Sequence, residues 1–175
     1  VLDKTGTLTT GKPKVSHIEF IEGEVREILS IAASLEHGST HPIADAITTA
    51  WSNVTNDRPE LSNVQNVGGM GIIGELNENI VAIGNEPLME KYGVDLAPRL
   101  EDIQRAAAKG VTISFVSKGK ELLGWIEVSD ALRPSTKSAL KHAKRNNLEV
   151  IMLTGDRVEA AQQIAKECGI EHDVA

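Results

Sequence analysis

The first residues of the chain place a carboxylate beside a run of small hydroxylated residues, in the order Asp-Lys-Thr-Gly-Thr-Leu-Thr from position 3 to position 9. An ionised carboxylate can attack the γ-phosphorus of a nucleotide and form an acyl phosphate, while nearby hydroxyl and backbone N–H groups hold the phosphate oxygens. Asp3 follows the apolar Val1 and Leu2, which predicts that it lies at the end of a buried strand. We therefore interpret Asp3 as a nucleophile toward phosphorus; the alternative is that it only caps a turn.

A second group of polar residues, Thr154-Gly155-Asp156, follows the apolar run at 148–153. An open parallel sheet binds ligands at the carboxyl ends of its strands, so Asp3 and Asp156 are expected at the same edge. Two acids there can share Mg²⁺ or flank a phosphate, and Thr154 adds a hydroxyl group.

The elements that must position these residues alternate between helix and strand at the C-terminal end. Residues 135–146 and 158–168 carry helical patterns, and 148–153 lies between them as an apolar strand, which is typical of a parallel sheet. We predict an α/β fold in which residues 1–14 and 129–175 form one parallel-sheet domain. An α+β domain, residues 15–128, is inserted into it.

The inserted domain is expected to hold an antiparallel sheet flanked by helices. Residues 5–13 before it are expected to be a loop. The predicted helices are 24–36, 41–51, 85–92 and 98–109, and the predicted strands are 17–21, 62–67, 71–76, 80–84, 111–117 and 121–128.

The composition excludes several classes of protein. The net charge of −7 argues against a nucleic-acid or anionic membrane surface, and the single cysteine, Cys168, excludes an internal disulfide. No run of residues approaches the apolar length of a membrane-spanning helix, and no signal peptide is visible. The chain starts with Val inside an apparent strand, so we expect it to be a piece of a larger protein.

Three short stretches of the inserted domain suggest a nucleotide pocket: Glu36 with His41-Pro42, the glycine-rich 68–74, and Gly84-Asn85. Each has a plainer explanation. The glycines satisfy the Gly-x-Gly-x-x-Gly dinucleotide pattern, but the residues that follow indicate strand, turn and strand where that motif requires a helix. They could equally mark a bulge or a close strand crossing, and His41 could be an ordinary first residue of a helix.

The seven residues from Asp3 to Thr9 resemble the phosphorylation signature of the P-type ATPases, ion pumps with a haloacid dehalogenase-like phosphorylation domain. Leu-Thr-Gly-Asp at 153–156 and Asp-Ala-Leu-Arg-Pro at 130–134, similar to the return hinge of the pumps, also match. The resemblance implies an incomplete haloacid dehalogenase-like domain in which Asp3 becomes phosphorylated. It also implies roles for further residues, with Lys4 and Thr5 lining the phosphate, Asp3 and the Thr5 carbonyl binding Mg²⁺, and Thr154, Gly155 and Asp156 contacting the phosphoryl group and nucleotide.

The inserted domain resembles the nucleotide-binding domain of heavy-metal pumps, which carry a His-Pro motif. By this resemblance, Glu36 accepts a hydrogen bond from the adenine N6 amino group and His41 orients the ring. Gly69 and Gly71 allow close approach of the nucleotide, and Gly84 and Asn85 support the pocket. The stretch Glu-His-Gly-Ser-Thr-His-Pro at 36–42 is nearer to zinc, cadmium and lead pumps than to copper pumps, which remain the alternative.

The resemblance implies a cytoplasmic part of an integral membrane pump that exports a heavy metal by hydrolysing ATP. Its partners would be ATP, the transmembrane and actuator domains, and a metal ion bound elsewhere. The family's further lysine and Gly-Asp-Gly segment do not occur here, so we expect this chain alone to bind ATP weakly without efficient turnover. Two other functions stay open: a soluble haloacid dehalogenase-like phosphatase and a regulatory nucleotide-binding module without activity.

Related phosphatases usually carry an acid two positions after the nucleophile, where it protonates the leaving group. This chain has Thr5 at that position. Threonine is a poor general acid at neutral pH, so we expect a long-lived phosphorylated intermediate, which suits a pump better than a phosphatase.

Overall fold

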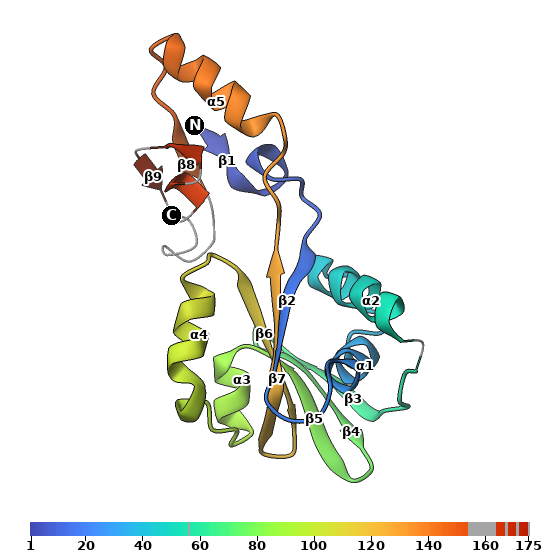
Figure 1. The fold of residues 1–175 in the computed structure, drawn as a ribbon. Coiled ribbons are helices and arrows are strands. Elements are labelled where there is room, and N and C mark those ends of the chain that lie inside the picture. The colour runs from blue at the N-terminus through green and yellow to red at the C-terminus, as the bar shows by residue number, and fades with distance from the viewer. Residues whose placement is uncertain (56, 154–163, 167, 171, 175) are drawn as a thin grey trace. The chain divides into compact units, whose positions relative to one another are not determined.

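The computed structural model describes residues 1–55, 57–153, 164–166, 168–170 and 172–174, and divides the chain into two compact units (Figure 1). The first unit comprises Val1–Pro13, Ile103–Thr112 and Ser129–Ala175, and the second comprises Lys14–Asp102 and Ile113–Val128. Residues 103–112 fall in the first unit, whereas the sequence assigned them to the inserted domain.

The second unit is built on a six-stranded sheet in the order β2-β7-β6-β5-β4-β3. β3, β4, β5 and β6 pair in antiparallel fashion along this order. The strands are β2 (Lys14–Phe20), β3 (Ser62–Val67), β4 (Gly71–Leu76), β5 (Asn79–Gly84), β6 (Thr112–Lys118) and β7 (Glu121–Ser129). The glycine-rich stretch therefore leads into a strand, a turn and a strand, as predicted, and the dinucleotide interpretation is excluded.

Helices α1 (Val25–Leu35) and α2 (Pro42–Val54) pack against this sheet and against each other. The apolar residues of α1 recur at helical spacing, so its buried face meets the strands: Ile28 and Leu29 are fully buried with Val81 and Val116. The helical segments between β5 and β6 are α3 (Glu86–Lys91), a 3₁₀ turn at Ala97–Arg99, and α4 (Leu100–Ala107), of which residues 103–107 fall in the first unit. The unit thus has the antiparallel sheet with flanking helices that the sequence predicted.

The first unit contains a parallel sheet in the order β1-β8-β9, with β1 (Leu2–Asp3), β8 (Ile151–Leu153) and β9 (His172–Val174). A helix, α5 (Thr136–Arg145), precedes β8 in the chain, and a π-helical turn spans Lys4–Leu8. The buried core of this unit gathers apolar residues from the π-helical turn, α5, β8 and the segment before β9: Leu8, Leu140, Met152, Ala165 and Ile170.

Three predictions of local structure need correction or completion here. The segment 5–13, expected to be a loop, contains the last residues of the π-helical turn. The strand expected over 148–153 begins only at Ile151, and β9 was not predicted at all. Of the helix expected over 158–168, the structure describes 164–166 as helical, while 158–163 lie outside the described residues.

Among the described residues, no helix combines the length and the apolar character that crossing a bilayer requires.

Candidate functional site

Asp3 lies at the carboxyl end of a parallel strand pair. Leu2 is in register with Met152 and Asp3 with Leu153, so β1 and β8 end side by side. Asp3 is exposed, and its side chain makes no capping hydrogen bond to the turn that follows. The turn-cap alternative is therefore wrong, and the carboxylate is presented at the sheet edge where parallel folds bind ligands.

The turn after Asp3 is closed by hydrogen bonds around Thr9, which is fully buried. The Thr9 amide donates to the Lys4 carbonyl over 3.0 Å, and the Gly6 amide donates to the Thr9 hydroxyl over 3.2 Å. Gly6 has a φ of +79°, a left-handed conformation that glycine adopts without steric cost. These bonds give the Thr-Gly-Thr stretch one defined shape.

Asp130 anchors this turn from the far end of the chain. Its carboxylate accepts hydrogen bonds from the Thr9 hydroxyl at 2.6 Å, the Thr10 hydroxyl at 2.8 Å and the Gly11 amide at 3.0 Å. Burial alone would raise the pKa of Asp130, but the hydrogen bonds from Thr9, Thr10 and Gly11 outweigh it and lower the pKa below the ordinary aspartate value. Asp130 therefore stays ionised as the acceptor for three donors.

Arg133 and Thr136 add a second set of bonds to the same turn. The Arg133 guanidinium donates to the carbonyls of Thr9 and Gly6 over 2.9 and 2.6 Å, and the Thr136 hydroxyl donates to the Leu8 carbonyl over 2.6 Å. The sequence singled out residues 130–134 only as a hinge-like match. The structure shows that this segment holds the turn that carries the candidate nucleophile.

The other predicted residues of this site are only partly described. Thr154, Gly155 and Asp156, and the side chain of Thr5, lie outside the described residues. Within the described residues no group of three or more His, Cys, Asp or Glu side chains is placed to hold a metal ion. The exposed carboxylate of Asp3 is a hard oxygen donor of the kind that Mg²⁺ prefers, so it fits part of a magnesium site.

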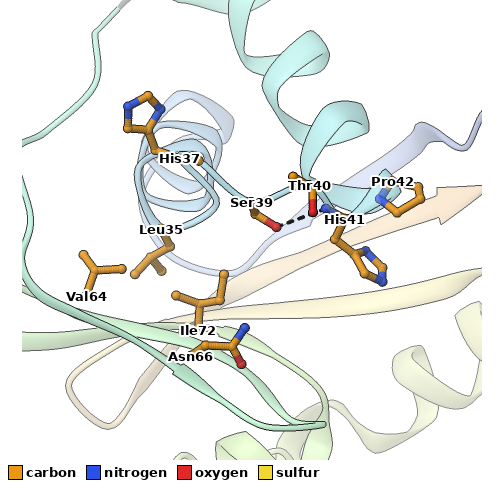
Figure 2. Close-up of a pocket in the computed structure, with 10 residues that line it drawn as sticks. Leu35, His37, Ser39, Thr40, His41, Pro42, Val64, Asn66 and Ile72 are labelled. Carbon is orange, nitrogen blue, oxygen red and sulfur yellow. Dashed lines mark hydrogen bonds between the residues drawn. The ribbon is translucent and has the colours of Figure 1, made fainter.

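The second unit carries a separate pocket of about 580 Å³ between the α1–α2 connection and strands β3 and β4 (Figure 2). Figure 2 shows Ser39, Thr40 and His41 on the connection and Asn66 and Ile72 on the strands. The lining residues are Leu35, His37, Gly38, Ser39, Thr40, His41, Pro42, Val64, Asn66 and Ile72. Four of these residues are apolar and five carry polar side chains, so the pocket offers both apolar contact and hydrogen-bonding groups.

His41 has a structural role as well as a place in this pocket. It is the N-cap of α2, and its Nδ1 accepts a hydrogen bond from the Ile43 amide over 3.2 Å. Pro42 takes the first helical position, where a missing N–H costs nothing. The Ser39 hydroxyl accepts from the His41 amide over 3.3 Å (Figure 2). His41 thus caps the start of a helix, close to the plainer explanation, although the first helical residue is Pro42, and it also lines the pocket.

Glu36 lies at the C-cap of α1, one residue before the pocket-lining His37. Its Oε2 is buried and has no hydrogen-bond partner among the described residues. Burial raises the pKa of Glu36, while a hydrogen bond with Ser39 and the charge of His41 partly offset the rise. A buried acceptor without a donor costs free energy, and Glu36 itself is not among the residues that line the pocket.

The predicted glycines and Asn85 gather at the start of β4, where Gly71 precedes the pocket-lining Ile72. The Asn85 amide group donates to the Gly69 carbonyl over 3.0 Å, and its Oδ1 accepts from the Leu88 amide, which caps α3. Gly71 and Gly84 are paired across β4 and β5. The alternative explanation of these glycines, a close approach of two strands, applies to this pair. A Cβ on Gly71 would collide with the Ile83 carbonyl oxygen.

This close approach predicts different effects for two neighbouring glycines. Gly71→Ala should destabilise the second unit by about 2 kcal/mol, since overpacking against backbone cannot relax through a side chain. Gly69→Ala, which meets nothing within 4 Å, should cost only the strain of its φ of +70°, about 1 kcal/mol. Urea unfolding of both variants measures the difference, and equal losses would contradict the packing argument.

Asn66 and Ile72 are lining residues that the sequence reasoning missed. They are register partners on β3 and β4, and both contribute to the pocket that holds His41. The alternation of residues along β3 could have indicated which of its side chains share a face, but not that this face meets the α1–α2 connection.

A model of the haloacid dehalogenase-like hydrolases matches the chain over residues 1–175. Among curated proteins, the copper-exporting P-type ATPase of Bacillus subtilis is 35% identical over 176 residues, which is 100% of this chain and 22% of that protein. The copper-transporting P-type ATPase of Rhizobium leguminosarum is 36% identical over 173 residues, which is 98% of this chain and 20% of that protein. The chain therefore spans about a fifth of the length of these relatives.

Solved structures give a similar result. A zinc-transporting PIB-type ATPase in the E2.Pi state superposes with a TM-score of 0.81 at 31% identity, covering 99% of this chain and 28% of that one. The catalytic domain of a CPx-ATPase gives a TM-score of 0.72 at 26% identity, over 98% of this chain and 58% of that one.

Proposed function

Since the chain belongs to the haloacid dehalogenase-like hydrolases and matches the cytosolic part of heavy-metal P-type ATPases over nearly its whole length, we propose that it is the ATP-binding and phosphorylation part of a metal-exporting pump. The observation that carries the proposal is Asp3, uncapped and exposed at the carboxyl end of β1, beside a turn fixed by Asp130 and Arg133.

In the proposed reaction, an Asp3 carboxylate oxygen attacks the γ-phosphorus of ATP. A bond forms between that oxygen and phosphorus, the bond from phosphorus to the β–γ bridging oxygen breaks, and ADP leaves with the electron pair. Backbone N–H groups of Thr5 and Thr7 and the Lys4 side chain hold the phosphoryl oxygens, while the Gly6 amide already donates to the Thr9 hydroxyl. Thr154, Gly155 and Asp156 contact the phosphoryl group and nucleotide. Mg²⁺, bound by Asp3 and the Thr5 carbonyl, would neutralise charge on the transferred group.

The second unit is proposed to hold the adenine ring. Glu36 supplies a buried acceptor for the N6 amino group, and His41 lines the neighbouring pocket. Gly69 leaves open backbone beside it, because a Cβ there would meet nothing within 4 Å. Gly71, packed against Ile83 and Gly84, fixes the shape of that backbone together with Gly84 and Asn85. A guanine carbonyl opposite Glu36 would set two acceptors against each other, so ATP is preferred over GTP.

Glu36 provides a test that uses this chain alone. Because burial raises its pKa, the ionised form is disfavoured in the folded state, and folding stability falls as pH rises through the folded pKa. Glu36→Gln should therefore raise the melting temperature at neutral pH. It should also weaken ATP binding about tenfold, because a charge-assisted hydrogen bond is replaced by a neutral one.

Calorimetry of ATP binding and thermal unfolding measures both effects, with Glu75→Gln as the control. Glu75 is a strand residue that accepts from Asn63 outside the pocket, and the variant should leave ATP affinity unchanged. Unaltered ATP affinity in Glu36→Gln would remove Glu36 from the adenine site.

The parent protein is proposed to be an integral membrane pump whose transmembrane and actuator domains bind the metal and couple it to phosphorylation. The curated relatives support copper as cargo, while the zinc-transporting structure and the stretch at 36–42 support the zinc, cadmium and lead group. We propose copper as the cargo to test first. Metal-stimulated ATP hydrolysis by the membrane-bound protein decides it, with Cu⁺, Zn²⁺, Cd²⁺ and Pb²⁺ compared in one assay.

The two other candidate functions make different predictions. A soluble phosphatase would hydrolyse generic phosphate esters rapidly, which Thr5 at the general-acid position opposes. A regulatory module would bind ATP without forming a hydroxylamine-labile phosphate on the complete protein.

A further inference from the structure

Helix α5, drawn in orange in Figure 1, carries a row of exposed cationic side chains. This basic stripe consists of four residues whose spacing places them on one side of the helix: Lys137, Lys141, Lys144 and Arg145. Leu140, in contrast, is buried with the apolar core of the first unit. The helix therefore packs through an apolar face and exposes a cationic one.

The charge of this helix is not balanced by its surroundings. Residues 131–148 contain no Asp or Glu, although the whole chain has 25 acidic residues against 18 Lys and Arg. Among the described residues, Lys137, Lys141 and Arg145 have no ion-pair partner. Lys141 lies four positions from both Lys137 and Arg145, and like charges at that spacing destabilise a helix. The stripe therefore carries a repulsion that an anionic partner would relieve.

The helix dipole accounts for only part of the stripe. Lys144 and Arg145 lie in the last turn, where cations interact favourably with the C-terminal end of a helix. Lys137 is the second residue of α5, where a cation is unfavourable, and the first turn contains no acid. An ordinary solvated helix end therefore does not explain why the cations run along the whole of α5.

We propose that the basic stripe binds the anionic lipid headgroups of the membrane in which the proposed pump lies. This inference rests on the proposed function, because a membrane-bound parent keeps the chain and a lipid surface together. Cations along one side of an amphipathic helix are typical of helices that bind lipid surfaces. The Lys ammonium is a compact charge without a fixed hydrogen-bonding geometry, which suits headgroups that move in the plane of a bilayer.

The net charge of −7 does not oppose this binding at close range. At physiological ionic strength the Debye length is about 8 Å, so acids farther than that from the stripe are largely screened. Each Lys or Arg that reaches an anionic bilayer strengthens binding about fivefold. The argument from net charge against an anionic membrane surface therefore applies to the molecule as a whole and not to α5.

Binding at α5 would act on the part of the chain that carries the candidate nucleophile. α5 begins at Thr136, whose hydroxyl donates to the Leu8 carbonyl in the turn after Asp3. Arg133, just before α5, donates to the Gly6 and Thr9 carbonyls around the same turn. Headgroup binding would therefore hold the first unit at the membrane through the segment that fixes the turn after Asp3.

Sedimentation of this chain with phosphatidylcholine vesicles, with and without phosphatidylglycerol, tests the proposal. The wild-type chain should bind only the vesicles that contain phosphatidylglycerol, and about 1 M salt should release it, because the Debye length then falls to about 3 Å. The double variant Lys137→Gln and Lys141→Gln should bind about 25-fold more weakly. Glutamine has nearly the helix propensity of lysine, so circular dichroism should show α5 unchanged.

The matched control is the double variant Lys91→Gln and Lys120→Gln, which makes the same change in net charge at exposed lysines of the second unit. The control should bind phosphatidylglycerol vesicles like the wild type. Equal losses of affinity in the two double variants would overturn the proposal, as would wild-type binding that does not depend on phosphatidylglycerol. If the wild-type chain binds polyglutamate but not the vesicles, the partner is an acidic protein segment and the lipid proposal is wrong.

ATP binding by the same chain keeps this test separate from that of the proposed function. Both double variants should bind ATP like the wild type, because none of the four lysines belongs to the candidate site. Loss of ATP binding by the wild-type chain would contradict the proposed function, whereas loss of vesicle binding alone contradicts only the role of α5.

Discussion

Replacing Asp3 with Asn should abolish the phosphorylated intermediate of the proposed pump and lower its ATP turnover by at least about 10³-fold, as expected for loss of a nucleophile. The amide cannot form the acyl phosphate, and its oxygen is a far weaker nucleophile than a carboxylate. Because Asp3 is exposed and its side chain makes no cap bond, the fold should be unaffected. Incorporation of ³²P from labelled ATP after acid quenching measures the effect.

The matched control is Asp95→Asn. Asp95 is an exposed acid whose Oδ1 accepts from the Ala97 amide, a bond that asparagine can keep. This variant should label like the wild type. Normal labelling in Asp3→Asn, with an unchanged circular dichroism spectrum, would mean that another group receives the phosphoryl.

Asp130→Ala should lower the free energy of unfolding of the first unit by about 3–4 kcal/mol. The substitution leaves the buried Thr9 hydroxyl, the Thr10 hydroxyl and the Gly11 amide without their shared acceptor. The Gly11 amide should also exchange faster with solvent. Asp130→Asn keeps an acceptor of the same shape, so its loss of unfolding free energy should be about half that of Asp130→Ala. The difference between the two variants separates the contribution of the negative charge from that of the side-chain shape.

The pH dependence of the same variant follows from the sign of the pKa change. The folded pKa of Asp130 lies below the ordinary value of 3.8, so the carboxylate binds protons less readily in the folded state. The stabilisation by the Asp130 carboxylate is complete at pH values above the pKa of the unfolded state. It is lost as the pH falls through the pKa of the folded state. Acid titration of unfolding should show this loss in the wild type and not in Asp130→Ala. Parallel curves for the two proteins would contradict the anchoring role.

Local patterns predicted much of this fold. The alternation of apolar residues gave the bounds of β3 and β4 as observed, and the helical stripe at 24–36 predicted α1 within a residue at each end. Burial of a single face does not explain these predictions, because residues 28–35 of α1 are all buried and residues 62–66 of β3 are exposed. The helical spacing of apolar residues still predicted α1.

The strand over 148–153 shows where such patterns mislead. Asn147 has a φ of +54°, and the Leu148 amide donates to the Ala143 carbonyl over 3.0 Å. These residues close the C-terminus of α5 in a Schellman-type arrangement, which favours an apolar residue at the position of Leu148. The helix end therefore uses the first apolar residues of the run, and the strand starts only at Ile151.

The residues of the candidate site could be predicted from the sequence only where they are close together in the chain. Asp3 was identified because its neighbours form a distinctive run. The anchoring of that run by Asp130 and Arg133 depends on contacts across more than 120 positions, which no local pattern carries. Asn66 was missed for the same reason, because its place in the pocket depends on how β3 meets the α1–α2 connection.

Chemical identification of the phosphorylated residue tests the central claim most directly. The membrane-bound protein is incubated with ATP, quenched in acid and reduced with borohydride, which converts an aspartyl phosphate to homoserine. Tandem mass spectrometry should then find homoserine at position 3 and at no other aspartate. A peptide that retains aspartate at position 3 while another residue carries the phosphate or its reduction product would contradict the account.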